Sequence, residues 1–161
     1  MEEATIAVLV VDDYGEWRQF ICRMLKKNLG LHVIGEASDG PEAVQKTQEL
    51  KPDLVLLDIG LPTLNGIEVA RRIGEVSPTS KILFVSENRY VEVAEEAMSM
   101  GARGYVVKSD AGSELLPAVK AVLEGKRFIS ASLAGHFLVA TTVSTTQTML
   151  PWMVTLISGI R

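Results

Sequence analysis

One stretch decides the fold, Leu54-Val55-Leu56-Leu57-Asp58-Ile59-Gly60-Leu61-Pro62. Four apolar residues lead into a carboxylate, and the run lies between Pro52 on one side and Gly60 with Pro62 on the other. A short, uninterrupted apolar run of this kind is typical of a strand that is buried on both faces of a parallel sheet. Asp58 is therefore expected at the carboxyl end of the strand, which is the edge where open α/β sheets bind ligands.

The segments on either side alternate between strand and helix patterns. Apolar, β-branched runs predict strands at 5–11, 31–37, 54–57, 81–85 and 104–107, and helical spacing predicts helices at about 15–29, 38–50, 64–74, 89–100 and 113–123. Pro117 lies inside the last of these helices, which is therefore expected to begin late or to bend. Short connections between alternating strands and helices predict an α/β fold, a doubly wound five-stranded parallel sheet with helices on both faces.

Composition bounds the class of protein. The chain has 161 residues, of which 47% are hydrophobic and 22% charged, as expected for one globular domain with an appendage. A net charge of −4 without a basic cluster argues against direct nucleic-acid binding. The single cysteine, Cys22, fits a reducing compartment, and the acidic N-terminus lacks the features of a signal peptide. A cytoplasmic location is expected.

Polar side chains follow four of the predicted strands. Asp12 and Asp13 end the first, Asp58 the third, Ser86 the fourth and Lys108 the fifth. Because these ends share one edge of a parallel sheet, three carboxylates, a hydroxyl and an ammonium group are expected to lie close together. Clustered carboxylates repel one another unless a cation neutralises them, and oxygen-only ligands favour Mg²⁺.

Mg²⁺ keeps several waters and takes one or two carboxylates, so we expect Asp13 and Asp58 as direct ligands and Asp12 through water. Ser86 and Lys108 would supply the donor and the positive charge that hold phosphoryl oxygens opposite a metal. Each residue alone also has an ordinary structural explanation, such as a helix cap for the acids and a solvated surface charge for Lys108. Their placement at successive strand ends favours a site.

These residues resemble a known family, the CheY-like receiver domain of two-component response regulators. The resemblance covers about residues 4–127. It rests on five motifs in order, Val10-Val11-Asp12-Asp13, Leu57-Asp58-Ile59-Gly60-Leu61-Pro62, Asn65-Gly66, Phe84-Val85-Ser86 and Gly101-Ala102-Arg103-Gly104-Tyr105-Val106-Val107-Lys108. It implies the strand order 2-1-3-4-5 and a three-layer, flavodoxin-like sandwich.

The resemblance also implies the chemistry. Asp58 would accept a phosphoryl group from the phosphohistidine of a sensor histidine kinase, with Lys108 pairing with that group and Ser86 donating to it. Asp13, Asp58 and the backbone carbonyl of Gly60 would ligate Mg²⁺, and Asp12 would bind it through water.

Tyr105 resembles the switch aromatic of the family, which turns inward as Ser86 moves towards the phosphate. This change would remodel the surface of the fourth helix, fifth strand and fifth helix. A population shift of this kind suits a nearly dianionic group with three strong acceptors. The chain is thus expected to be a signalling domain rather than an enzyme, with at most autocatalytic phosphoryl acceptance and autodephosphorylation.

Three positions depart from the common pattern. Glu87 follows Ser86 where the family often has a small residue, so its carboxylate is expected to modulate the lifetime of the phosphorylated state. Ser109 follows Lys108 where many receivers have proline, so a cis peptide bond there would be costly. Gly60 offers no side chain over the site, which leaves water access more open.

The C-terminal extension, residues 128–161, is the least expected part. Residues 125–130 resemble the end of receivers that continue into a LuxR-type helix-turn-helix, yet no basic helix pair follows. The extension could pack on its own domain with a short helix at 131–140, reach a second chain to form a homodimer, or be a truncated or altered remnant. A homodimer through the surface of the fourth helix, fifth strand and fifth helix is also open. A membrane span is not expected, because no run of about 20 apolar residues is present.

Two other functional classes need comparison. A phosphatase of the haloacid-dehalogenase type also has an aspartate at a strand end, but it needs a second acid where this chain has Gly60. A pseudo-receiver would use the fold for protein contacts without phosphorylation, and it usually lacks an acid or the lysine, all of which are present here.

Overall fold

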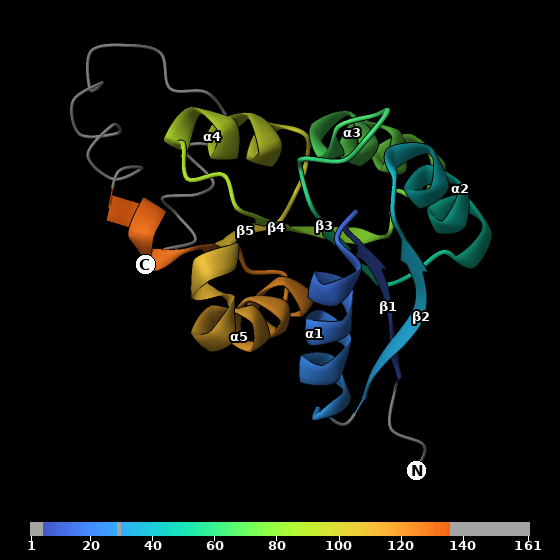
Figure 1. Ribbon diagram of the computed structural model, residues 1–161, viewed down its shortest axis with the longest axis horizontal. Helices are drawn as coiled ribbons and strands as arrows, with labels where there is room; N and C mark the ends of the chain where they lie inside the picture. Colours follow the sequence, from blue (N-terminus) through green and yellow to red (C-terminus); the bar gives the residue numbers. More distant parts are fainter. Residues whose placement is uncertain (1–4, 29, 136–161) are drawn as a thin grey trace.

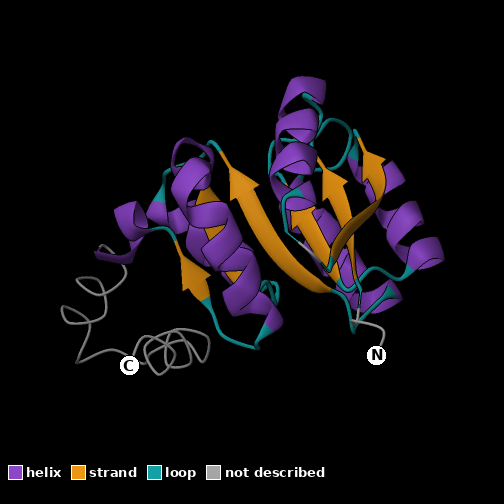
Figure 2. Cartoon of the chain, turned by 90° about the horizontal axis from the view of Figure 1, so that it is seen from below, coloured by secondary structure: helices purple, strands orange, loops and turns teal. Residues whose placement is uncertain are grey.

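The computed structural model describes residues 5–28 and 30–135, which form one α/β domain. Its strands are β1 Ile6–Val11, β2 Leu31–Ala37, β3 Leu54–Leu57, β4 Lys81–Ser86, β5 Gly104–Val107 and β6 Phe128–Ile129. Its helices are α1 Gly15–Lys26, α2 Gly40–Leu50, α3 Gly66–Val76, α4 Val91–Ser99 and α5 Ala111–Leu123, with a 3₁₀ turn η1 at Lys108–Asp110. All paired strands are parallel, in the order β2-β1-β3-β4-β5-β6, and their arrows point the same way in Figure 2.

The sheet has six strands, so the prediction of five was wrong. The five predicted strands are present in the predicted order, and β6 extends the sheet beyond β5. Gly104 pairs with Phe128, and Tyr105 with Ile129. A two-residue strand is too short for an alternating pattern to be recognised in a sequence.

Helices cover both faces of the sheet. Helices α1 and α5 lie on one face, and α2, α3 and α4 lie on the other (Figure 1). Each face has its own buried hydrophobic cluster, one containing Ile21, Leu25 and Val119 and the other containing Val69 and Met98. Strands β3 and β5 are buried along their whole length, as expected for strands covered on both sides.

Local hydrogen bonding explains where the helices begin. Asn65 accepts from the amides of Ile67 and Glu68, so α3 begins at Gly66, two residues later than predicted. Helix α5 begins at Ala111, before the predicted start, because η1 leads directly into it. Pro117 lies within α5, so the expectation of a late start was wrong.

The described residues continue beyond β6 as far as residue 135. Residues 131–135 are helical, and the rest of the helix predicted at 131–140, with the remainder of the extension, lies outside the described residues. Within 5–28 and 30–135, every peptide bond is trans, including the one between Lys108 and Ser109. In that same part of the chain, no helix combines the length and the apolar character that crossing a membrane requires. The cytoplasmic location stays a prediction.

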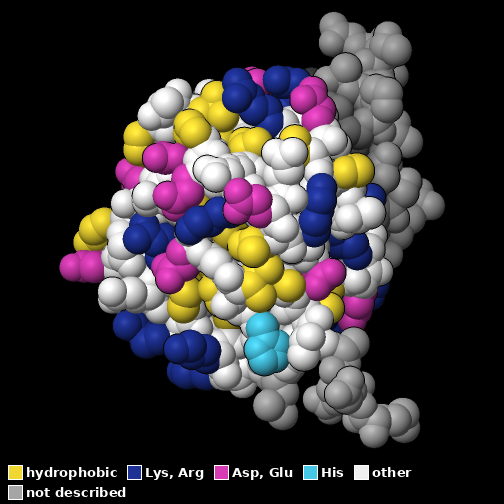
Figure 3. All heavy atoms as spheres, turned by 90° about the vertical axis from the view of Figure 1, so that its right-hand side faces the viewer, with side chains coloured by type: hydrophobic (Ala, Val, Ile, Leu, Met, Phe, Trp, Pro, Cys, Tyr) yellow, Lys and Arg dark blue, Asp and Glu magenta, His cyan; other side chains and the backbone are white. Residues whose placement is uncertain are grey.

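Charges of both signs are mixed on the surface formed by β2 and α2. Lys and Arg side chains lie among Asp and Glu side chains in Figure 3, with hydrophobic side chains scattered between them. Ile34 and Leu50 are two of the exposed hydrophobic residues. This face has the mixed character of an ordinary protein surface.

Candidate phosphoacceptor site

The register of the sheet brings the two buried acids side by side. Val11 pairs with Leu57, so Asp12 and Asp58 follow paired residues at the carboxyl ends of β1 and β3. The amide of Asp58 donates to the carbonyl of Val11 at 3.0 Å. On the other side of β4, Ser86 pairs with Val107, so Lys108 comes one residue beyond it.

The three predicted carboxylates form one cluster. Asp12, Asp13 and Asp58 each have an oxygen within 4.8 Å of the others. Asp12 and Asp58 are only 2% and 7% exposed, whereas Asp13 is exposed. Two acids are thus largely withdrawn from water while the third faces it.

Lys108 reaches this cluster from the end of β5, on the other side of β4. Its ammonium nitrogen lies 2.6 Å from Oδ2 of Asp12 and 3.6 Å from Oδ2 of Asp58. The same nitrogen lies 5.1 Å from the centre of the Trp17 ring, a cation–π distance. Trp17 on α1 therefore supports the lysine, a role that its helical spacing did not indicate.

Burial raises the pKa of Asp58 from an ordinary 3.8 to about 6, and the negative charge of Asp12 acts in the same direction. The Lys108 ammonium group and the Ile59 amide, which donates to Oδ1 at 2.9 Å, oppose the rise. Asp58 is thus mostly ionised at neutral pH, although burial and the charge of Asp12 make its ionised form less stable than in water. A cation bound nearby would stabilise the ionised form.

The donor set fits Mg²⁺. Oδ1 of Asp12 accepts from the Tyr14 amide, and its buried Oδ2 is paired with the Lys108 ammonium group. Oδ1 of Asp58 is likewise occupied by the Ile59 amide. The acidic cluster could therefore hold a hard divalent cation.

A glycine supports the loop behind Asp58. The amide of Gly66 donates to the carbonyl of Ile59 at 2.7 Å. A Cβ atom at Gly66 would lie 2.0 Å from the carbonyl oxygen of Asp58 and 2.7 Å from Cα of Ile59. The start of α3 can pack this closely against the acceptor loop only because residue 66 has no side chain.

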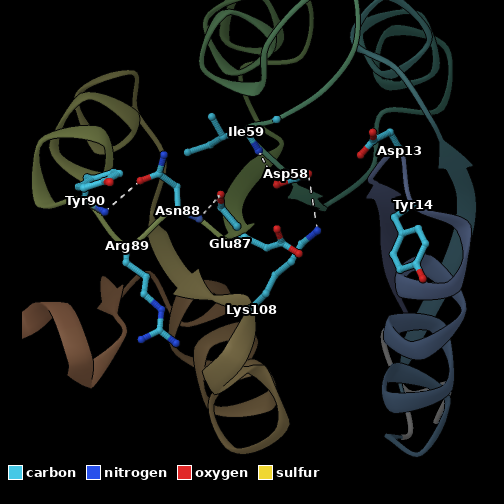
Figure 4. A pocket seen from close by; sticks show the side chains of 11 residues that line it. Asp13, Tyr14, Asp58, Ile59, Glu87, Asn88, Arg89, Tyr90 and Lys108 are labelled. Carbon is cyan, nitrogen blue, oxygen red and sulfur yellow. Dashed lines mark hydrogen bonds and ion pairs between the residues drawn. The ribbon is translucent and has the colours of Figure 1, made fainter.

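Asp13 and Asp58 open into one pocket, which Asp12 does not line (Figure 4). The predicted site residues that line it are Asp13, Asp58, Gly60, Ser86, Glu87 and Lys108. Sequence reasoning missed its other lining residues, Tyr14, Ile59, Asn88, Arg89 and Tyr90. Tyr14 and Tyr90 are 59% and 70% exposed. The position of these residues just after β1, β3 or β4 was the one signal in the sequence that could have indicated them.

Asn88 connects the pocket to Tyr105. Its amide donates to Oγ of Ser86 at 3.1 Å, and its carbonyl accepts from the Tyr105 hydroxyl at 2.7 Å. Tyr105 is fully buried, and burial raises the pKa of its hydroxyl. Its ring does not line the pocket, but it reaches the pocket residue Ser86 through this one loop.

Comparisons with known proteins agree with this geometry. Residues 8–120 match the response regulator receiver domain family. Over 129 residues the chain is 37% identical to response regulator GacA of Pseudomonas viridiflava and 34% identical to response regulator UvrY of Escherichia coli. These alignments cover 80% of this chain and 60% and 59% of the two relatives. The chain thus spans about three fifths of the length of the curated relatives that it matches.

Solved structures give the same result. A two-component response regulator of the LuxR family from Aurantimonas sp. SI85-9A1 is 32% identical with a TM-score of 0.82, covering 86% of this chain and 99% of that one. The response regulator domain of Thermotoga maritima CheB is 30% identical with a TM-score of 0.69, covering 74% and 97%. The family match spans most of the chain, and the carboxylate cluster, Lys108 and the sheet order all agree with it, so the chain belongs to the response regulator receiver domain family.

Proposed function

We propose that Asp58 accepts a phosphoryl group from the phosphohistidine of a sensor histidine kinase. Membership of the receiver family supports phosphorylation-dependent signalling by this domain. The observation that carries the residue assignment is the position of the Asp58 carboxylate, beside the Lys108 ammonium group and two further acids and lining an open pocket.

The transfer uses Asp58 as the nucleophile. An oxygen of its ionised carboxylate attacks phosphorus, and the bond between phosphorus and the imidazole nitrogen breaks, returning the electron pair to the ring. With a pKa of about 6, Asp58 is in the reactive form at neutral pH. Lys108 then attracts the phosphoryl oxygens, and Ser86 on the same pocket wall donates a hydrogen bond to them.

Asp13, Asp58 and the carbonyl of Gly60 would hold Mg²⁺, with Asp12 binding it through water. When bound, such an ion would supply positive charge that offsets the clustered carboxylates and the charge on the transferring group. The close grouping of the three carboxylates supports this assignment.

The switch would run through Asn88. When Ser86 turns towards the phosphoryl group, its hydroxyl must leave the Asn88 amide, and the loop that also binds Tyr105 must adjust. Because Asn88 Oδ1 accepts from the Tyr90 amide at the start of α4, the change would reach the surface formed by α4, β5 and α5.

What the domain signals to is inferred by analogy with its relatives. Response regulators GacA and UvrY extend beyond the aligned residues, and the described residues of this chain hold the receiver domain alone. We propose that the domain signals to a partner rather than to DNA directly, and that any homodimer uses the α4, β5 and α5 surface or the extension. The division into a receiver at 1–127 and an extension at 128–161 is part of this proposal.

Acetyl phosphate with Mg²⁺, followed by intact mass, distinguishes the three classes. One phosphoryl adduct per wild-type chain supports the receiver with its slow autodephosphorylation. Turnover of many equivalents of a phosphoester would favour a phosphatase, and a folded chain that forms no adduct would favour a pseudo-receiver.

A further inference from the structure

Ser130 follows β6 and is fully buried beside β5. Its amide donates to the Tyr105 carbonyl at 2.9 Å, so it continues the backbone pairing of the two strands. Its hydroxyl accepts from the Val107 amide at 2.8 Å and donates to Oε2 of Glu114 at 2.6 Å. The side chain thus ties the end of β5 to the first turns of α5.

This contact lies directly behind the proposed phosphoryl-binding lysine. Val107 is the last residue of β5, and Lys108 is the next residue along the chain. The Val107 amide is buried and has no strand partner beyond Ile129, so the Ser130 hydroxyl takes the place of one. Without it, a buried amide donor at the base of Lys108 would lose its acceptor.

Residues after Ser130 also contact the far end of the turn η1 and the start of α5. Ser132 Oγ donates to Oδ2 of Asp110 at 2.9 Å, and the Ala131 amide donates to Oε1 of Glu114 at 3.1 Å. Leu133, which is 3% exposed, packs in the hydrophobic cluster that contains Tyr105. The turn η1, which carries Lys108, is therefore held at both ends by residues 130–132.

We propose that Ser130 is a positioning residue for Lys108, and that residues 130–135 are energetically coupled to the phosphoryl site. The inference rests on the proposed function. A lysine that is already held in place loses less conformational freedom when an anion binds, so the anion binds more tightly. The coupling is reciprocal, because an anion that favours the held position of Lys108 must also favour the contacts that hold it.

The test measures the affinity for beryllium trifluoride in the presence of Mg²⁺, with Trp17 fluorescence as the signal. Trp152→Phe removes the other tryptophan of the full chain. We expect Ser130→Ala to weaken binding by about fivefold or more, the lower range of allosteric couplings. Glu114→Ala removes the acceptor of the Ser130 hydroxyl and should weaken binding in the same direction.

The matched control is Ser77→Ala. Ser77 is also a buried serine, bonded to Ser80 Oγ at 2.7 Å, but it precedes β4 and so lies at the opposite edge of the sheet. It should lower the melting temperature while leaving the affinity unchanged. If Ser130→Ala and Glu114→Ala behave like this control, the inference is overturned and the proposed function stands.

Hydrogen exchange tests the reverse direction. The amides of Leu133 and Ala134 both donate to the Ser130 carbonyl at 2.9 Å. Beryllium trifluoride should slow their exchange in the wild type and have less effect in Ser130→Ala. Unchanged exchange in a wild type that binds the anion contradicts the coupling, and a wild type that binds no anion contradicts both the coupling and the proposed function.

Discussion

The ammonium nitrogen of Lys108 lies 2.6 Å from Oδ2 of Asp12, which is closer than its 3.6 Å distance to Oδ2 of Asp58. The lysine is therefore paired first with the acid that we assign to the metal, and only second with the proposed acceptor. A cation beside Asp12 would compete for that carboxylate and leave Lys108 to interact with a group on Asp58.

Lys108→Ala should destabilise the protein and reduce formation of the phosphoryl adduct. The substitution leaves two buried carboxylates without their ammonium partner, which costs about 3–5 kcal/mol of unfolding free energy. Urea denaturation at pH 7.5 without Mg²⁺ measures this loss, and Lys120→Ala on the exposed surface of α5 is the control. Equal midpoints for the two variants would count against the electrostatic role of Lys108.

Asp58→Asn should stabilise the protein at neutral pH. The folded pKa of about 6 exceeds the ordinary 3.8, so the native state binds the extra proton between these values and its stability falls as pH rises through that window. Asparagine does not ionise, so the variant should gain about 2–3 kcal/mol over the wild type at pH 7.5, and the gain should vanish below about pH 4. The measurement is unfolding free energy against pH without Mg²⁺. If the difference in unfolding free energy between the variant and the wild type stayed constant from pH 4 to pH 7.5, the ionisation of Asp58 could not be its cause.

Mg²⁺ should raise the melting temperature of the wild type, because an ion that binds only the folded state stabilises it by mass action. Asp13→Ala should abolish most of this shift, since Asp13 is one of the proposed direct ligands. Glu49→Gln changes an exposed acid on α2 and should keep the full shift. A shift of equal size in all three proteins would indicate an unspecific salt effect.

Gly66→Ala should be strongly destabilising, whereas Gly74→Ala on the same helix should be neutral or stabilising. A Cβ atom at Gly66 would meet the Asp58 carbonyl at 2.0 Å, while nothing lies within 4 Å of a Cβ atom at Gly74. Helix propensity alone favours alanine by about 0.5–1 kcal/mol at both positions. Thermal melts should thus move in opposite directions, and a harmless Gly66→Ala would refute the close packing behind the acceptor loop.

Glu87→Ala should lengthen the lifetime of the phosphorylated state. Glu87 lines the pocket, where its carboxylate can repel the phosphoryl group or orient the hydrolytic water, and either effect is lost with the side chain. Decay of the adduct is followed by intact mass after removal of acetyl phosphate. Equal decay rates for variant and wild type would exclude a modulating role for this residue.

The sequence predicted the parts of the site that depend on strand ends. Buried strands are short apolar runs, so the positions of Asp12, Asp58 and Ser86 after them followed from the pattern. Neighbouring parallel strands share one edge, and this alone was enough to expect the cluster. Lys108 followed from the same reasoning at the end of β5.

The contacts that support the site could not be predicted in this way. Trp17 lies beside Lys108 because of how α1 packs on the sheet, and a helical pattern shows only that its face is apolar. Ser130 and Glu114 are 16 residues apart and meet only once β6 has formed. Such contacts depend on tertiary packing, which local sequence patterns do not encode.

The most direct test of the central claim is to locate the phosphoryl group. After incubation with acetyl phosphate and Mg²⁺, borohydride reduces the acyl phosphate to an alcohol, which marks the modified residue for peptide mass mapping. We predict a single mark at Asp58, absent from Asp58→Asn and from wild type treated without acetyl phosphate. A mark at Asp12 or Asp13, or an adduct that persists unchanged in Asp58→Asn, would contradict the assignment of Asp58 as the phosphoacceptor.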